Sequence, residues 1–348
     1  MVEIWYALVA IVFAIYVVLD GFDFGAGIVA PFVAKGDAER RMVLGAIGPY
    51  WDGNEVWLLA GGGSLFVAFP GALASGISGF YFAIFLVLWC LIGRGISIEF
   101  RSHLADPMWR SVWDAAFVGT SFLLALFFGV AFGNLVRGLP LGADGWFALT
   151  LFTSFLPTDP VGILDVFTVL SGLFAVVALA AHGAAFLAWR TGGAVAARSR
   201  TAHRRGLVLV SVLWPLVTGA TAWINRELFS AIALRPLAAA LTLLAVGSLV
   251  YGFIARARGN DRMAFVASSA FLVGILGATA AALFPVLLPA RGAAELSITA
   301  YEAANDARGL RVALGWFAFG LPLALVYLGI VGWLHRGRAT AAADGEGY

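Results

Sequence analysis

Long stretches of apolar residues constrain the fold of this chain more strongly than any other feature of its sequence. An α-helix needs about 20 apolar residues to cross the core of a bilayer. Only 12% of the residues are charged, whereas a soluble chain typically carries about 25%, so an ordinary water-exposed surface is excluded. The sequence predicts an all-α polytopic membrane protein with about nine transmembrane helices, over residues 5–32, 49–71, 75–99, 112–135, 161–189, 206–225, 237–255, 263–288 and 310–334.

We expect the predicted helices to form a single transmembrane domain over residues 1–335. Phe69-Pro70 and Phe284-Pro285 end the second and eighth helices on the same side of the membrane, because the residue before a proline disfavours helical backbone. This correspondence favours an internal repeat of two four-helix units. The predicted segments are a first unit over 1–140, a second over 160–290, an extra helix over 310–334 and a cytoplasmic tail over 336–348.

The distribution of positive charge predicts the orientation of the chain. Lys and Arg concentrate in the cytoplasmic loops of membrane proteins. Of the 22 Lys and Arg residues, 16 lie in the loops after the first, third, fifth, seventh and ninth helices or in the helix ends beside them. The remaining 6 lie on the opposite side. The N-terminus is therefore predicted to lie outside and the C-terminus in the cytoplasm.

Several classes of function are excluded or disfavoured by what the sequence lacks. The single cysteine, Cys90, excludes a disulfide framework and a four-cysteine metal site. The net charge of +2 predicts no nucleic-acid partner. Haem iron usually takes His or Met ligands, but among these residues only His182 lies in the middle of a predicted span. We therefore expect no haem in this chain, and interpret His182 as a hydrogen-bonded packing residue or as the lining of a lipid or quinone site.

Carboxylates inside predicted membrane helices indicate where function resides, because such groups are costly in a bilayer and usually face protein or water. Asp20 and Asp23 lie three residues apart, on one face of the first helix. Asp52 and Glu55 repeat this spacing in the second helix. Both pairs fall in the cytoplasmic half of the predicted bilayer, so we interpret the four acids as a proton pathway open to the cytoplasm.

Neighbouring residues support this interpretation and leave alternatives open. Trp51 and Trp57 would flank the acids and limit access of lipid and water, with Asn54 between them. Asp52 and Glu55 could instead cap the second helix, and Asp20 and Asp23 could form structural ion pairs. The partners in such pairs would be Arg94 and Arg101, which otherwise would extend toward the lipid headgroups.

At these residues the sequence resembles subunit II of the cytochrome bd quinol oxidases. The similarity extends over most of the chain and is densest in its first 140 residues. It is carried by Leu19 to Gly27, Glu39-Arg40-Arg41, Trp51-Asp52-Gly53-Asn54 through Trp57-Leu58, Ser78-Gly79-Phe80-Tyr81, Arg94, Arg101, Trp113-Asp114, Gly129 to Pro140 and Leu283-Phe284-Pro285.

The resemblance implies a function in a bacterial cytoplasmic membrane. It implies a partner, subunit I, which carries two b-type haems and haem d, oxidises quinol and reduces oxygen to water. The present chain would have no catalytic residue. It would support subunit I and supply protons, with Asp52 the residue carried over most firmly, followed by Asp20 and Asp23. The resemblance also implies contact with membrane lipid and quinone, and admits a small single-helix subunit.

Two other functions fit the residues without the resemblance. A proton-coupled secondary transporter would also contain intramembrane acids, Gly-rich helices and an internal repeat, but it would act without a haem-bearing partner. A structural assembly factor would need no proton pathway, so replacing Asp52 would leave oxygen reduction intact.

Overall fold

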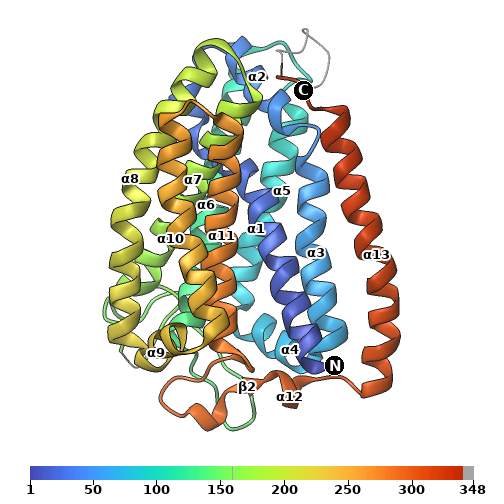
Figure 1. The fold of residues 1–348 in the computed structure, drawn as a ribbon, viewed down its shortest axis with the longest axis vertical. Helices are drawn as coiled ribbons and strands as arrows, with labels where there is room; N and C mark the ends of the chain where they lie inside the picture. The colour runs from blue at the N-terminus through green and yellow to red at the C-terminus, as the bar shows by residue number, and fades with distance from the viewer. Residues whose placement is uncertain (159, 340–348) are drawn as a thin grey trace.

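The computed structural model describes residues 1–158 and 160–339, which fold into a bundle of long helices (Figure 1). Within these residues, eight helices are long and apolar enough to cross a membrane. They are α1 (Val2–Val33), α5 (Tyr81–Phe100), α6 (Pro107–Arg137), α7 (Val166–Arg190), α8 (Gly193–Ile224), α10 (Pro236–Ala257), α11 (Asp261–Leu283) and α13 (Ala307–Leu334). The predicted fold class, an all-α polytopic membrane protein, is confirmed.

Shorter elements connect the long helices. α3 (Trp51–Ala68) is the more polar ninth candidate and runs beside α1 (Figure 1). The remaining helices are α2 (Asp37–Ile47), α4 (Pro70–Gly79), α9 (Arg226–Leu234), α12 (Ala300–Ala303) and the 3₁₀-helix η1 (Ala294–Leu296). A small antiparallel sheet pairs β1 (Val286–Leu288) with β2 (Ile298–Thr299).

The prolines end helices where the sequence predicted. α3 stops at Ala68 before Phe69-Pro70, and α11 stops at Leu283 before Phe284-Pro285. Other predicted bounds were wrong. The segment predicted as one helix over 75–99 is divided between α4 and α5 at Phe80, and α8 starts at Gly193 rather than near 206.

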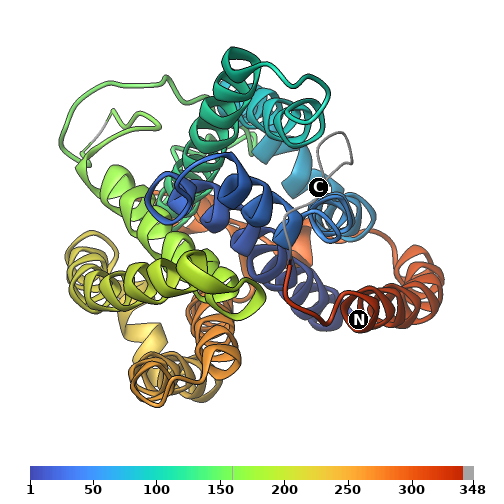
Figure 2. The ribbon, with the colours of Figure 1, turned by 90° about the horizontal axis from the view of Figure 1, so that it is seen from above.

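The helices form two groups around α1, as the view from above shows (Figure 2). α1 contacts α3, α6 and α7, while α7 packs against α8 and α10 packs against α11. α13 lies at the edge of the bundle and contacts α3 (Figure 2). This arrangement is compatible with two four-helix units and an extra helix, although the repeat itself stays a prediction. Most of the predicted tail, residues 340–348, lies outside the described part of the chain.

Small residues bring α1 and α7 into direct backbone contact. A Cβ atom added at Gly25 would overlap the backbone of Leu179 and Gly183, and one added at Gly183 would overlap the backbone of Gly25. Such contacts are typical of membrane helices, and they bring the backbones of α1 and α7 together beside Asp20 and Asp23. Gly62 and Gly63 of α3 make no such contact, because no described atom of a neighbouring segment lies within 4 Å of a Cβ placed there.

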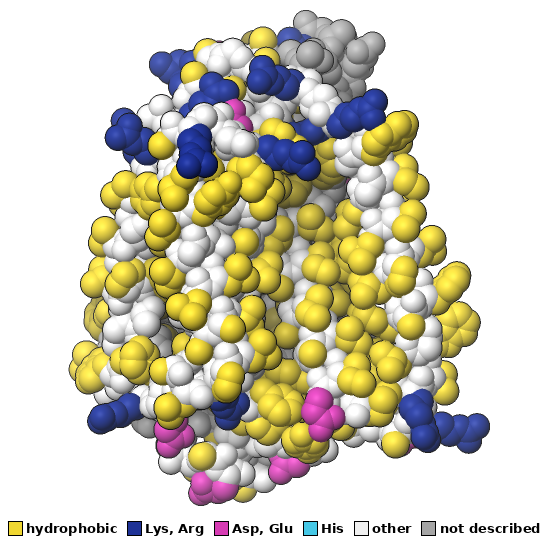
Figure 3. Space-filling view, viewed as in Figure 1, with side chains coloured by type: hydrophobic (Ala, Val, Ile, Leu, Met, Phe, Trp, Pro, Cys, Tyr) yellow, Lys and Arg dark blue, Asp and Glu magenta, His cyan; other side chains and the backbone are white. Residues whose placement is uncertain are grey.

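Positive charge is more abundant at one end of the bundle than at the other (Figure 3). On the face in Figure 3, Lys and Arg gather at the end that carries α2 and the C-terminus, and an apolar band covers the middle. Several acidic side chains lie at the opposite end of this face (Figure 3). We call the end that carries α2 the basic end.

Candidate functional site

The centre of the candidate site is an arginine buried between three helices. Arg94 of α5 places Nη1 2.6 Å from Oδ1 of Asp20 on α1, and Nη2 donates a hydrogen bond to Glu55 of α3. The side chains of Arg94 and Asp20 have no exposed surface, whereas Glu55 is 27% exposed. The guanidinium also lies over the Phe24 ring, 4.6 Å from its centroid. Of the alternatives for Arg94, the ion pair is therefore correct and extension to the headgroups is wrong.

The second buried carboxylate, Asp23, has a neutral partner instead of an arginine. Nδ2 of Asn54 donates a hydrogen bond to Oδ2 of Asp23 at 2.8 Å and lies 3.2 Å from the carbonyl oxygen of Leu19. The other carboxylate oxygen of Asp23 is buried without a hydrogen-bond partner among the described residues. Asp23 therefore retains an oxygen that could bind a proton.

The two tryptophans lie as expected on either side of this contact. Trp51, Asn54 and Trp57 are spaced by three residues along α3, and all three are buried, so they share one helical face. Trp51 lies against Gly95 of α5, at 3.4 Å from a Cβ placed there, and Trp57 packs in an apolar cluster that includes Tyr16. The aromatic rings thus close the site above and below Asn54.

Asp52 stands apart from the buried acids. Its side chain is exposed at the start of α3, on the same face as the exposed Val56 and Leu59. No hydrogen bond or ion pair joins it to another residue within the described ranges. Of these two acids of α3, only Glu55 contacts Arg94, so the role of Asp52 in a proton pathway stays a prediction.

Arg101 belongs to a separate network near the basic end, which links α2, the end of α5 and α6. Its Nε donates to Asp114 at 2.5 Å and its Nη2 donates to Asp37 at 2.8 Å. Arg110 donates to the other oxygen of Asp37 at 2.8 Å. Partial burial favours protonation of Asp37, but the hydrogen bond and charge of Arg101, with Arg110 and Arg41, outweigh it and lower the Asp37 pKa. The predicted pairing of Arg101 with Asp20 and Asp23 was therefore wrong.

Comparison with known proteins assigns this arrangement to a family. The family model for cytochrome bd terminal oxidase subunit II matches residues 1–335. The chain belongs to this family. It is 31% identical to cytochrome bd-I ubiquinol oxidase subunit 2 of Escherichia coli, over 97% of this chain and 94% of the relative. It is 36% identical to cytochrome bd ubiquinol oxidase subunit 2 of Bacillus subtilis over 61% of this chain and 60% of that protein.

A solved structure supports the fold. The bd oxidase of Geobacillus thermodenitrificans contains a chain that superposes with a TM-score of 0.76, at 17% sequence identity, over 96% of this chain and 98% of that one. The resemblance inferred from the sequence is confirmed at the level of the family. The chain is thus a multi-pass membrane subunit of the bd-type respiratory oxidoreductases.

Two histidines of this family member, His182 and His203, are buried and hydrogen-bonded inside the bundle. In His182, Nδ1 lies 2.7 Å from Oγ of Ser268 and Nε2 lies 2.9 Å from the carbonyl oxygen of Val18. This geometry is that of a hydrogen-bonded packing residue and does not fit an axial haem ligand. His203 is buried within α8, with Nδ1 2.9 Å from the carbonyl oxygen of Ala181 and no hydrogen-bond partner for Nε2 among the described residues.

One buried ionic site at the opposite end of the bundle was missed. Arg137 at the end of α6 donates to Asp165 and, at 2.6 Å, to Oδ1 of Asn134. Asp165 also caps α7 by accepting a hydrogen bond from the Thr168 amide at 2.8 Å. The Asp165-Val-Phe-Thr168 pattern of a capping box was the available signal.

Proposed function

We propose that this chain is the haem-free subunit II of a bd-type quinol:oxygen oxidoreductase, which supports subunit I and conducts protons toward it from the cytoplasm. Subunit I would carry haem b and haem d and would oxidise quinol. The family assignment favours this function over a proton-coupled transporter. The chain's own residues would supply the buried acids and the surface that contacts the partner.

The main support is the imbalance of charge in the buried cluster. Asp20, Asp23 and Glu55 share a single cation, Arg94. If all three acids were ionised, the cluster would have a formal charge of −2, which is unfavourable in a medium of low dielectric constant. A proton on one carboxyl reduces that charge. Asp23, whose side-chain partner is the neutral Asn54 and not Arg94, is the residue we assign to hold it.

The order of the residues suggests a direction for transfer. Asp52 is exposed at the start of α3, Asp23 follows within the bundle, and Asp20 lies one helical turn deeper along α1. At about 1.5 Å of rise per residue, Asp23 and Asp20 are offset by ~4.5 Å along the helix axis. The partly exposed Glu55 offers a second contact with water or with the partner.

The proposed orientation places the start of this path in the cytoplasm. The basic end of the bundle carries α2, the start of α3 and the end of α13 (Figures 1 and 3). Positive charge marks the cytoplasmic side of membrane proteins. We therefore propose an outer N-terminus and a cytoplasmic C-terminus.

Neutral, nearly isosteric variants test the proton path. In the assembled complex, we expect Asp23→Asn to slow ubiquinol-driven oxygen consumption by roughly tenfold or more, because an amide cannot pass on a proton. Asp52→Asn should slow it less, since water can reach the next acid by way of Glu55. Oxygen uptake is measured per haem, so that differences in assembly cancel.

A carboxylate at the other end provides the matched control. Glu295 is exposed in η1, and Glu295→Gln should leave oxygen uptake unchanged. Normal uptake per haem in the Asp23→Asn variant, with an unaltered haem spectrum, would show that the cluster is structural and would defeat the proposed proton path.

A further inference from the structure

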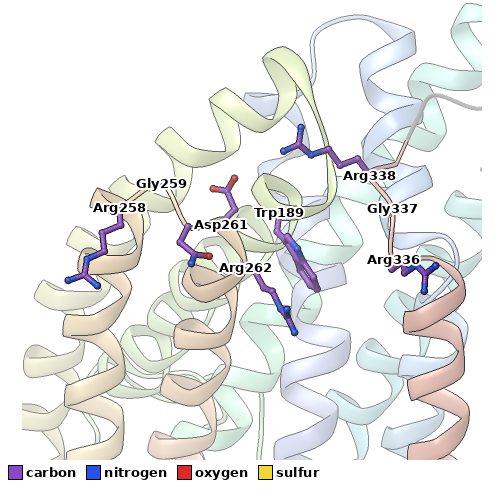
Figure 4. A pocket seen from close by; sticks show the side chains of 9 residues that line it. Trp189, Arg258, Gly259, Asp261, Arg262, Arg336, Gly337 and Arg338 are labelled. Carbon is purple, nitrogen blue, oxygen red and sulfur yellow. The ribbon is translucent and has the colours of Figure 1, made fainter.

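A cavity of about 540 Å³ opens at the basic end of the bundle. Three separate parts of the chain line it: Trp189 at the end of α7, the turn between α10 and α11, and the segment that follows α13. The lining residues are Trp189, Arg258, Gly259, Asn260, Asp261, Arg262, Arg336, Gly337 and Arg338. Figure 4 shows Arg262 of α11 and Arg338 of the segment after α13 near Trp189.

The cavity has a clear excess of positive charge. Four arginines and a single acid line it, and that acid, Asp261, is already bound by Arg200 at 2.7 Å and by Arg256. Within the described ranges, none of the four lining arginines forms an ion pair with an acidic residue. Their charges are therefore available to an anionic ligand.

The backbone adds a second feature that favours an anion. The 23-residue helix α11 begins at Asp261, in the wall of the cavity. Asn260 caps it through the amide of Met263 at 3.1 Å. Amide groups in the first turn of a helix and the positive end of its dipole attract phosphate oxygens.

The cavity is built by defined contacts between segments far apart in the sequence. The amide of Ala339 donates to the carbonyl oxygen of Arg190 at 2.7 Å, which holds the segment after α13 against the end of α7. Trp189 stacks on Phe265 of α11, with ring centroids 5.6 Å apart. These contacts place arginines from α11 and from the segment after α13 around one space.

The surroundings identify the type of molecule that carries the anion. Below the basic end, the face in Figure 3 is apolar, and large apolar side chains are exposed on the two flanking helices. On α13, Ile330 is 52% exposed and Leu334 61% exposed, and on α11 Val266 is 44% exposed. Tryptophans such as Trp189 and Trp333 are typical of the boundary between headgroups and acyl chains.

We propose that this cavity binds the phosphate of an anionic phospholipid, with the acyl chains lying along the apolar surfaces of α11 and α13. Basic pockets between membrane helices suit such headgroups. Arg262 and Arg338 would contact the phosphate directly, while Arg258 and Arg336 lie at the rim. The lipid would connect α13, which otherwise contacts the bundle mainly through α3, to α11 and α7.

Native mass spectrometry of the delipidated membrane complex, purified through this chain, tests the proposal with phosphatidylglycerol as the probe. Phosphatidylcholine with the same acyl chains is added in parallel. The paired variant Arg262→Gln and Arg338→Gln should weaken retention of one phosphatidylglycerol by roughly tenfold or more, since each arginine near an anionic headgroup contributes substantially to binding. Phosphatidylcholine retention should be weak and unchanged.

The matched control removes the same charge at the same end of the molecule. Arg204 and Arg205 are exposed on α8 outside the cavity, and Arg204→Gln with Arg205→Gln should change retention less than about twofold. If the two paired variants lost phosphatidylglycerol retention equally, the lipid would be held by general electrostatic attraction and not by the cavity, and the proposal would be overturned. Displacement of the lipid by inorganic phosphate at similar concentration would also overturn it, by assigning the site to a free anion.

Discussion

The two ends of the bundle bury arginines in different ways. Toward the basic end, Arg94 is shared by Asp20 and Glu55, and Asp23 lies next to them with only Asn54 as its partner. At the other end, Arg137 pairs with Asp165, which also caps α7. Among the residues that the structure describes, the first site has three acids and one cation, whereas the second pairs one arginine with one acid.

This difference separates a structural ion pair from a cluster suited to chemistry. In a balanced pair every charge has a partner, so there is no need for a proton to enter or leave. In the Arg94 cluster, the number of bound protons determines the net charge. Carboxyl groups can gain or lose a proton at modest cost, whereas a guanidinium remains charged. We therefore expect substitutions at the two sites to have different consequences.

The largest effect on stability is expected at the balanced site. Asp165→Asn keeps the helix cap, because the amide oxygen still accepts from Thr168, but it removes the carboxylate charge that pairs with the buried Arg137. Removing one partner of a buried pair typically costs about 3–5 kcal/mol. Thermal unfolding of the purified complex should show a marked loss, while oxygen uptake per remaining haem stays normal.

Asp306 offers the control for this substitution. It caps α13 at the same end of the bundle, accepting from the amides of Arg308 and Gly309 at 2.9 Å each, but it is exposed. Asp306→Asn should therefore have little effect on unfolding. If the two variants lost equal stability, the negative charge of Asp165 would add nothing to the stability that its capping hydrogen bond provides.

A smaller loss of stability is expected when the arginine of the acid-rich cluster is removed. Arg94→Gln leaves Asp20 and Glu55 without their cation, but these carboxyls can bind protons and so avoid burying net charge. We expect a loss of about 1–3 kcal/mol that shrinks as the pH is lowered, together with slow oxygen uptake. Arg205→Gln, at an exposed position, serves as the control. If Arg94→Gln lost as much stability as Asp165→Asn, and lost it independently of pH, the two sites would not differ in the way proposed.

The sequence was sufficient to predict the elements that depend on local composition. The length of the apolar stretches predicted the membrane helices, and the Phe-Pro pairs predicted two helix ends. The spacing of Asp20 and Asp23 predicted that they share a helical face. The partners of these residues could not be predicted, because they depend on packing between distant helices. Arg94 lies in α5 and Arg101 directly after its last residue, seven positions further on, yet they pair with different sets of acids.

The exposure of Asp52 illustrates the same limit. Its neighbours Trp51 and Asn54 are buried, and only the rotation of α3 against α1 and α5 decides that Asp52 faces outward. A helical pattern specifies which residues share a face, but it does not specify what that face contacts. In a subunit that assembles with another chain, the surface exposed here includes the surface that a partner would cover.

The smallest effect is expected for the partly exposed network around Arg101, which extends the comparison to a site in contact with water. The side chain of Asp37 is 35% exposed, and its pKa in the folded chain lies below the ordinary value of 3.8. A lowered pKa stabilises the fold above the ordinary value, and this contribution is lost as the pH falls through the folded pKa. Solvent screening limits it to about 1 kcal/mol or less.

Asp37→Asn should therefore lower the unfolding temperature slightly at neutral pH, and less as the acid range is approached, with oxygen uptake unchanged. The exposed Asp144→Asn, at the opposite end and without an ion pair in the described part of the chain, is the control. High salt should also shrink the effect, because exposed pairs are screened whereas buried ones are much less so. A salt-independent loss as large as that at Asp165 would mean that the Arg101 network is effectively buried, as it would be if a partner subunit covered α2 and the end of α5.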